Sequence, residues 1–279
     1  MFYSVLSSRR TLKASILLTA VLGAAAHAQQ SPALDRVSIA VGAFNAEPKI
    51  HAAGDTDNYG RVETPEAKTG HTTLPRIKAE MLFGDSQGLQ LDYFRYDKDY
   101  DPTFSGTSTN NGQPISGNAS AHGNLKLDLA QLAYRWWLGH DADVFGIGVG
   151  AAYLHARVEA TGTANFAGNL GANIPASVSG HGEASESAFA PLLEFGYRHA
   201  FVNPNIRFYA EASGIKKNGG NVDGHIYGGN VGVEWFPVKQ VGVVLDYGIQ
   251  KIKLNRNSAR NEELDVRLTG PSAYVKVRF

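Results

Sequence analysis

The stretch Leu268-Thr-Gly-Pro-Ser-Ala-Tyr-Val-Lys-Val-Arg-Phe279 ends the sequence on a strictly alternating pattern. Because successive side chains of a strand point to opposite sides, its last six residues divide into two faces. One face carries Val275, Val277 and Phe279, and the other carries Tyr274, Lys276 and Arg278. A soluble sheet that ended here would leave an unpaired edge. In a closed membrane barrel the apolar face would meet lipid and the charged face would meet the lumen.

The first 28 residues have the pattern of a secretory signal peptide. Arg9, Arg10 and Lys13 precede an apolar run over 14–26, and Ala26-His27-Ala28 supplies the small residues of a cleavage site. The run is shorter than the roughly 20 apolar residues that a spanning helix needs. We therefore expect residues 1–28 to be a signal peptide and residues 29–279 to be one domain exported through the periplasm.

Alternating segments fill the rest of the chain, and the connections between them differ in length. Short turns are expected at 84–88, 139–143, 202–205 and 237–240, whereas Glu47–His71, Asp97–His122 and Thr161–Glu186 read as long polar loops. Short periplasmic turns that alternate with long extracellular loops are typical of outer-membrane barrels. The predicted fold is all-β: a transmembrane antiparallel up-and-down barrel of about ten strands, with eight as the alternative.

One strand departs from simple alternation. In Asn124–Leu138 the apolar phase changes from Leu125, Leu127 and Leu129 to Leu132, Tyr134 and Trp136. A β-bulge adds one residue to a strand and so exchanges its two faces. We expect a bulge near Ala130.

Aromatic residues are expected to form two belts, because amphipathic rings prefer the two membrane interfaces. The predicted lower belt, at the periplasmic side, contains Phe83, Trp136/Trp137, Phe195/Tyr197, Trp235/Phe236 and Phe279. The predicted upper belt contains Tyr93/Phe94, Tyr153, Phe208 and Tyr247.

The inward positions carry nearly balanced charge. They are Arg76, Lys78, Glu80, Asp92, Lys126, Asp128, Glu194, Arg198, Arg207, Glu211, Glu234, Asp246, Lys276 and Arg278. A barrel of about eight to ten strands has an interior that its own side chains fill, so these charges should pair and plug the lumen. The alternative is a narrow pore for small solutes, for which Gly146, Gly148 and Gly150 would leave space.

The long polar stretches allow two interpretations. Asn124–Leu138 and Phe145–Glu159 exceed the roughly 9–11 residues that a span needs, so the strands could continue beyond the membrane as a rigid ribbon. Alternatively the stretches are loops that contact a surface ligand, since loops above about 12–15 residues are usually functional or disordered.

Little in the sequence indicates catalysis. No His is followed two positions later by Ser, as a barrel phospholipase would require. The omptin proteases use one Asp pair and one Asp–His pair, and Asp97/Asp99 and Asp223/His225 match only these short patterns. We therefore expect no enzyme, with an omptin-like protease as a minor alternative.

No catalytic, metal or cofactor residues are predicted, and the ligand-binding residues stay unknown. The equal numbers of acidic and basic residues, 26 each, argue against a nucleic-acid partner.

The signal peptide, the alternating strands and the final Phe279 resemble those of small Gram-negative outer-membrane β-barrels, including the OmpW-like and opacity-type porin group. The resemblance is at the level of the class, and no family motif transfers a residue role. It implies an integral outer-membrane protein with a structural, adhesive or small-solute role. The implied partners are outer-membrane lipid, lipopolysaccharide and, through Phe279, the barrel-assembly machinery.

Overall fold

The computed structural model describes residues 31–279 except 57–59, 64–66, 69, 102, 111–112, 140, 169–176, 202–204, 220–221 and 258–260. The predicted signal peptide, 1–28, lies outside the described residues. In the part of the chain that is described, no helix is long and apolar enough to cross a membrane.

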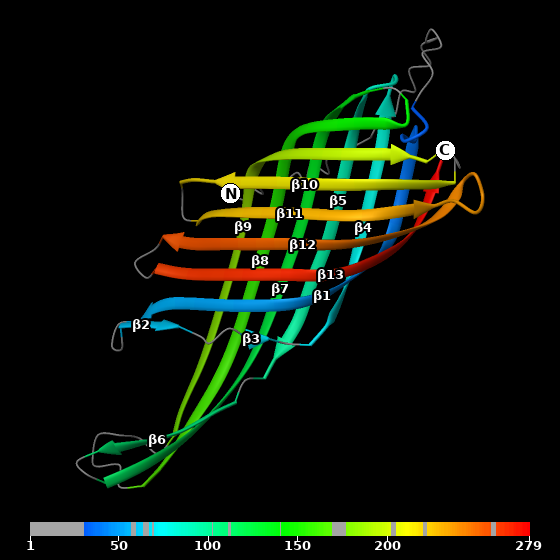
Figure 1. The fold of residues 1–279 in the computed structure, drawn as a ribbon. Helices are drawn as coiled ribbons and strands as arrows, with labels where there is room; N and C mark the ends of the chain where they lie inside the picture. The colour runs from blue at the N-terminus through cyan, green and yellow to red at the C-terminus, as the bar shows by residue number, and fades with distance from the viewer. Residues whose placement is uncertain are drawn as a thin grey trace, which may run out of the picture.

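The described residues form one antiparallel sheet that closes on itself, because β13 pairs with both β12 and β1 (Figure 1). The strands are β1 (Val37–Thr56), β2 (Gly60–Glu63), β3 (Ala67–Lys68), β4 (Thr72–Phe83), β5 (Gln87–Tyr100), β6 (Thr103–Asn110), β7 (Gln113–Leu138), β8 (Asp143–Gly168), β9 (Ser177–Ala200), β10 (Ile206–Lys217), β11 (Val222–Trp235), β12 (Val241–Asn257) and β13 (Asn261–Arg278).

The sheet has thirteen strands among the described residues, so the prediction of about ten, or eight, was too low for the sheet as a whole. The strands β2, β3 and β6, which are 4, 2 and 8 residues long, were not predicted. Each of these pairs with one long strand, β1 or β7. The other ten strands follow one another around the ring in chain order, as in an up-and-down barrel.

Short connections link β4 to β5, β7 to β8, β9 to β10 and β11 to β12 at one end of the barrel, which we call the short-turn end. Gly84 and Gly139 in two of these turns have φ angles of 63° and 105°, which glycine adopts without the clash of a Cβ atom. The opposite end, where β7, β8 and β9 project, is the hairpin end (Figure 1).

The predicted long loops are largely strand. β1 continues to Thr56, and β7, β8 and β9 are 26, 26 and 24 residues long. β7 pairs with β8 without interruption from Ile115↔Gly168 to Leu138↔Phe145. These Gly-, Ser- and Ala-rich segments need no apolar core, since lateral pairing satisfies their backbone groups. The structure therefore agrees with the first interpretation of the polar stretches, in which the strands continue as a ribbon.

The predicted β-bulge near Ala130 was wrong. β7 keeps one register with β5 and one with β8 through the whole region. Leu125, Leu127 and Leu129 face the interior and are at most 5% exposed, whereas Leu132 and Trp136 face outward. The apolar phase changes because the interior itself changes from apolar to polar along the strand. Lys126 and Asp128 consequently lie outside, and their assignment to the lumen was also wrong.

Three layers fill the barrel from the short-turn end to the hairpin end. Residues 31–35, which we call the strap, lie first, with Leu34 packed in a cluster with Leu82 and Trp137. A layer of charged side chains follows. Beyond it is an apolar layer that includes Phe44, Leu74, Phe94, Leu127, Leu129, Ile215, Ile252 and Leu268.

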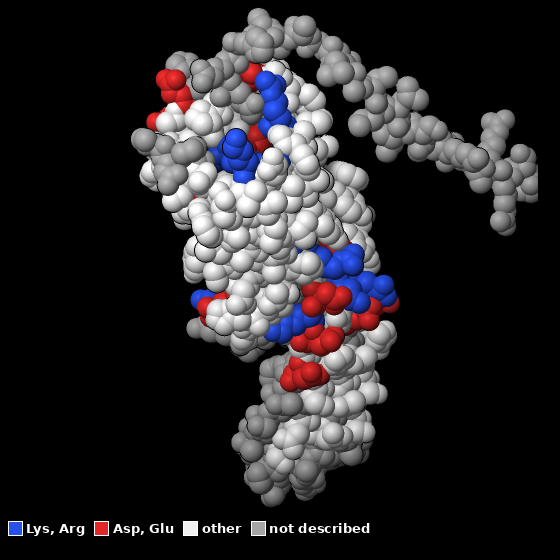
Figure 2. Space-filling model, turned by 90° about the vertical axis from the view of Figure 1, so that its right-hand side faces the viewer, with Lys and Arg blue, Asp and Glu red and all other residues white. Residues whose placement is uncertain are grey.

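The outer wall of the barrel is apolar. Its exposed side chains include Val41, Leu132, Phe145, Phe195, Val231, Leu245, Tyr247 and Val275. On the face shown in Figure 2, uncharged side chains cover the middle of the barrel, and charged side chains gather in a band next to the projecting sheet. A wall that is apolar in its middle and charged next to the projecting sheet suits lipid.

The aromatic belts are confirmed only in part. Phe83, Trp136, Phe195, Trp235 and Phe279 are exposed near the short-turn end, whereas the exposed Tyr247 lies near the middle of β12 and not at the hairpin end. Trp137, Phe236 and Phe94 instead point inward and are at most 7% exposed. Phe208 follows a short turn directly, so it lies at the opposite end from the one predicted.

Phe279 lies at the seam that closes the barrel. Its backbone N–H donates to the Val37 carbonyl at 2.9 Å, and its carbonyl accepts from the Val37 N–H at 3.3 Å.

We expect Phe279→Asp to impair assembly, because it places a carboxylate on the outward face of the seam. Heat-modifiable gel mobility and the amount of protein in outer-membrane fractions would measure this. Val238→Asp is the control, since Val238 is also exposed at this end but lies in a turn. A normal level of folded Phe279→Asp protein would contradict the expectation.

Candidate functional site

The charged layer contains the predicted lumen residues except Lys126 and Asp128. Its members are Asp35, Arg76, Lys78, Glu80, Asp92, Arg135, Glu194, Arg198, Arg207, Glu211, Glu234, Asp246, Lys276 and Arg278. Seven of these side chains are basic and seven are acidic. Every one takes part in an ion pair, so the layer is close to neutral.

Glu211 on β10 is the centre of this layer. Its carboxylate lies 3.5 Å from Lys78 Nζ, 3.2 Å from Arg135 Nη1 and 3.4 Å from Arg198 Nη2. These three cations come from β4, β7 and β9, which Glu211 therefore joins across the interior. Two of them have further acidic partners, since Arg135 pairs with Glu194 at 2.9 Å and Arg198 donates to Glu80 at 2.8 Å.

Asp35 in the strap is the centre of a second cluster. Its carboxylate is 2.7 Å from Arg207, 3.1 Å from Lys276 and 3.4 Å from Arg278. The Ser31 hydroxyl holds the other end of the strap by donating to the Asp141 carbonyl at 2.6 Å. The strap is thus fixed across the short-turn end by buried ion pairs on one side and a turn on the other.

Sequence reasoning missed two members of the charged layer. Asp35 precedes the first strand, so no alternation indicated its direction. The sequence does indicate the direction of Arg135, because it lies between the outward-facing Tyr134 and Trp136 and must therefore point inward. Its guanidinium lies 5.1 Å from the centre of the Trp137 ring, and that of Arg198 lies 4.9 Å from it. Trp137 thus contacts both guanidinium groups.

Large side chains lie against two of the strand glycines, Gly146 and Gly196. A Cβ atom on Gly146 would be only 2.9 Å from side-chain atoms of both Arg135 and Trp137. One on Gly196 would be 3.1 Å from Arg135. The side chains of Arg135 and Trp137 therefore take the space beside Gly146, one of the three glycines that were expected to leave a passage.

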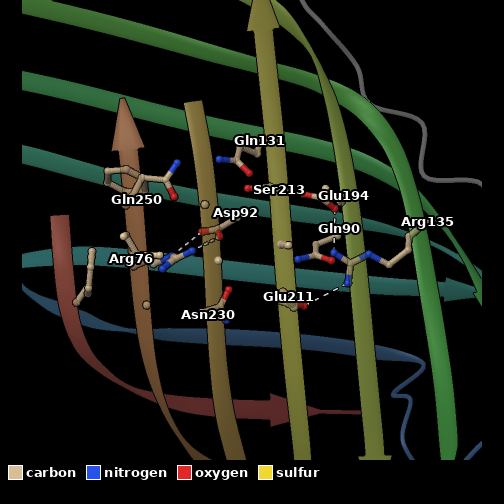
Figure 3. A pocket seen from close by; sticks show the side chains of 17 residues that line it. Arg76, Gln90, Asp92, Gln131, Arg135, Glu194, Glu211, Ser213, Asn230 and Gln250 are labelled. Carbon is tan, nitrogen blue, oxygen red and sulfur yellow. Dashed lines mark hydrogen bonds and ion pairs between the residues drawn. The ribbon is translucent and has the colours of Figure 1, made fainter. Parts of the chain in front are cut away.

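A small polar cavity lies between the charged layer and the apolar layer (Figure 3). Its volume is about 30 Å³, and its labelled lining includes Gln90, Gln131, Ser213, Asn230 and Gln250. Gln90 Oε1, Asn230 Nδ2 and Gln250 Nε2 have no hydrogen-bond partner among the described residues. A cavity of this volume accommodates one or two waters. It is too small for a nutrient-sized solute.

The projecting sheet at the hairpin end consists of β6 and the outer parts of β7, β8 and β9 (Figure 1). β9 pairs with β8 from Ser177 onwards, but it pairs with β10 only from Leu192. One edge of β9 over Ser177–Pro191 therefore has no strand beside it among the described residues. We call this segment the free β9 edge.

The residues of the protease alternative are not brought together. Asp97 and Asp99 lie on β5, where both accept hydrogen bonds from Asn124 Nδ2 at 3.1 and 2.7 Å. Asp223 and His225 lie on β11, which is on the opposite side of the ring from β5. All four alternate with inward residues and so point outward, away from one another.

The described residues contain no group of three or more His, Cys, Asp or Glu side chains that could hold a metal ion.

Comparison with known proteins gives only distant matches. No protein-family model matches the chain, and no curated protein matches it. Among solved structures, the outer-membrane protease OmpT from Escherichia coli matches with a TM-score of 0.44 and 10% identity over 87% of this chain and 96% of that one. The outer-membrane protein OprG from Pseudomonas aeruginosa has a TM-score of 0.35 and 10% identity over 90% and 100% of the two chains. The attachment invasion locus protein Ail of Yersinia pestis has a TM-score of 0.27 and 11% identity over 87% and 99%. Identities this low transfer no residue role.

The wall and the backbone pairing define the environment of the chain. Strands can cross lipid only when a closed ladder satisfies their backbone groups. Here β13 closes on β1, and the wall that this closure completes exposes Val41, Leu245 and Val275. Because lipid suits such a wall and water does not, this chain has the fold of a membrane-spanning β-barrel.

Proposed function

We propose that this barrel serves a structural or adhesive role at the cell surface, where the projecting sheet contacts a surface ligand and the lumen does not conduct. In this proposal the short-turn end faces the periplasm and the hairpin end faces outward. The observation that carries the proposal is the projecting sheet. β7 and β8 have 26 residues each, whereas a span needs roughly 9–11.

The side chains of the projecting sheet favour contact with a ligand over packing into a core. Ser116, Asn118, Ser120, Thr163 and Asn165 are all exposed. The free β9 edge adds backbone N–H and C=O groups that an extended polypeptide can pair with, which is a common mode of peptide recognition. Both features suit adhesion, and neither is needed to close the barrel.

The filled interior supports the rest of the proposal. The strap, the charged layer and the apolar layer lie in series, and the described cavities inside the barrel are about 20–30 Å³. A narrow porin is the second candidate, favoured by the polar cavity around Gln90 and Gln250, and it would require the strap and the apolar layer to move. An enzymatic role is not part of the proposal, because the four protease-like residues lie apart.

Excision of the projecting sheet tests the proposed role. One variant replaces 162–180 by Asn-Gly, which joins the register partners Thr161 and His181, and a second replaces Thr103–Ala121 by a tight turn. We expect both to remain folded and membrane-inserted, because the ring strands are retained, and to lose adhesion. Heat-modifiable mobility reports folding, and retention of expressing cells on immobilised host-cell protein reports adhesion.

A matched control shortens a different hairpin. Replacing 255–263 by Asn-Gly joins the register partners Leu254 and Leu264 at the β12–β13 tip and should leave adhesion unchanged. Failure of the first two variants to insert would show that the projecting sheet supports the barrel. Unchanged adhesion in folded variants would remove the proposed role.

A further inference from the structure

Three basic residues form a row on the outer wall near the hairpin end. Lys49 on β1 is directly opposite Arg267 on β13, which is directly opposite Lys251 on β12. Their chain neighbours Val266 and Ile252 are buried in the interior, so the three basic side chains point outward. Like charges directly opposite one another across strands are destabilising. An anion placed between these side chains would therefore stabilise the row.

At Arg267, the middle residue of the row, no carboxylate of the described residues meets that need. Three other cations towards the hairpin end have close acidic partners: Arg95 is 2.6 Å from Asp128, Arg157 is 2.8 Å from Glu183 and Lys253 is 2.6 Å from Glu263. Within the row, Lys251 reaches only Asp265, at 3.6 Å. Arg267 forms no ion pair with any described residue, although it is exposed and lies between two lysines.

The wall beside the row is hollowed by an apolar groove of about 850 Å³. Its lining comes from β8 to β13, with small residues such as Ala210, Ala212 and Gly229 between larger ones such as Phe195 and Tyr247. Register places Phe145 near the short-turn end of the groove and Arg267 at the opposite end. The groove therefore runs along the wall and ends beneath the basic row.

We propose that the row binds the phosphate of an outer-leaflet lipid whose acyl chain lies in the groove. A guanidinium matches two phosphate oxygens at once, and the flanking lysines supply further positive charge. The groove lies in the part of the wall that faces lipid, so an acyl chain is the occupant that its surroundings provide. The assignment to the outer leaflet rests on the orientation in the proposed function. The choice of a phosphorylated lipid rests on the row and the groove.

Native mass spectrometry of the full-length mature barrel in detergent tests this site, with diphosphoryl lipid A as the probe. We expect one lipid to be retained by the unaltered protein, and the double variant Lys251→Gln/Arg267→Gln to bind about tenfold or more weakly, since hydrogen bonds to charged groups are lost. Lipid A from which the phosphates have been removed should bind the unaltered protein as weakly. Arg157→Gln, a matched loss of an exposed but paired cation, should bind like the unaltered protein.

Three results would overturn the proposal. The first is equal affinity of the double variant and the unaltered protein for diphosphoryl lipid A. The second is displacement of the lipid by inorganic phosphate alone, which would indicate a site for a free anion. The third is equal binding of phosphatidylglycerol, which would remove the specificity for an outer-leaflet lipid.

The orientation is tested separately. A cysteine introduced by Ser185→Cys, at an exposed position of the free β9 edge, should react with a membrane-impermeant thiol reagent on intact cells. Lack of labelling would contradict the proposed orientation and therefore also the proposed surface role. The affinity difference measured in detergent would still decide whether Arg267 binds lipid phosphate.

Discussion

Replacing Glu211 by Gln should lower the free energy of unfolding by about 3–5 kcal/mol, the usual range when one partner of a buried ion pair is removed. The substitution keeps the shape of the side chain and removes the single negative charge that Lys78, Arg135 and Arg198 share. Burial is what makes the loss large, because water cannot replace the missing carboxylate. The change would be measured by unfolding the protein in lipid vesicles with increasing urea and recording the loss of heat-modifiable gel mobility.

Glu183→Gln is the matched control. Glu183 also pairs with an arginine, at 2.8 Å from Arg157, but its side chain is 47% exposed. Exposed pairs of this kind contribute about 0–1 kcal/mol, so this variant should unfold at nearly the same urea concentration as the unaltered barrel. Equal effects of the two substitutions would show that water reaches the charged layer, and would favour the narrow pore.

Alternation alone was enough to predict much of this layer. Glu194 and Glu211 each lie between outward apolar residues, and Arg198 lies between the outward Tyr197 and His199. The period of two in a strand therefore sets their direction once one face is known to meet lipid. The same reasoning failed for Lys126 and Asp128. It assumed that the interior is polar along the whole strand, whereas at their level the interior is apolar and Leu125, Leu127 and Leu129 fill it.

Other features could not be predicted from the sequence, for physical reasons. Asp35 lies in a segment without periodicity, and only the folded chain shows that it meets Arg207 and Lys276. The projecting strands contain too few apolar residues to show alternation, because they are held by lateral pairing and bury no core of their own. The row of Lys49, Lys251 and Arg267 depends on the register between strands that are distant in sequence.

The two ends of the lumen are closed by different kinds of interaction. At the short-turn end, Asp35 holds the strap through three cations, so closure there is electrostatic. Towards the hairpin end the closure is apolar, with Leu127, Leu129 and Leu268 fully buried. An ion that entered from either side would have to separate buried pairs or cross a layer without polar groups, and both steps are unfavourable.

The unaltered barrel should therefore give no stable channels in planar lipid bilayers, or only conductance steps at least roughly tenfold below those of wide sixteen-stranded porins, whose lumen is an aqueous channel. Single-channel recording with refolded protein would measure this, with a general porin as the positive control. Deleting 31–35 removes the electrostatic closure and leaves the apolar layer in place, so this variant should also lack large channels. Large, stable channels in the unaltered protein would contradict the closed interior and make the narrow-porin candidate, with a displaced strap, the better description of the barrel in a membrane.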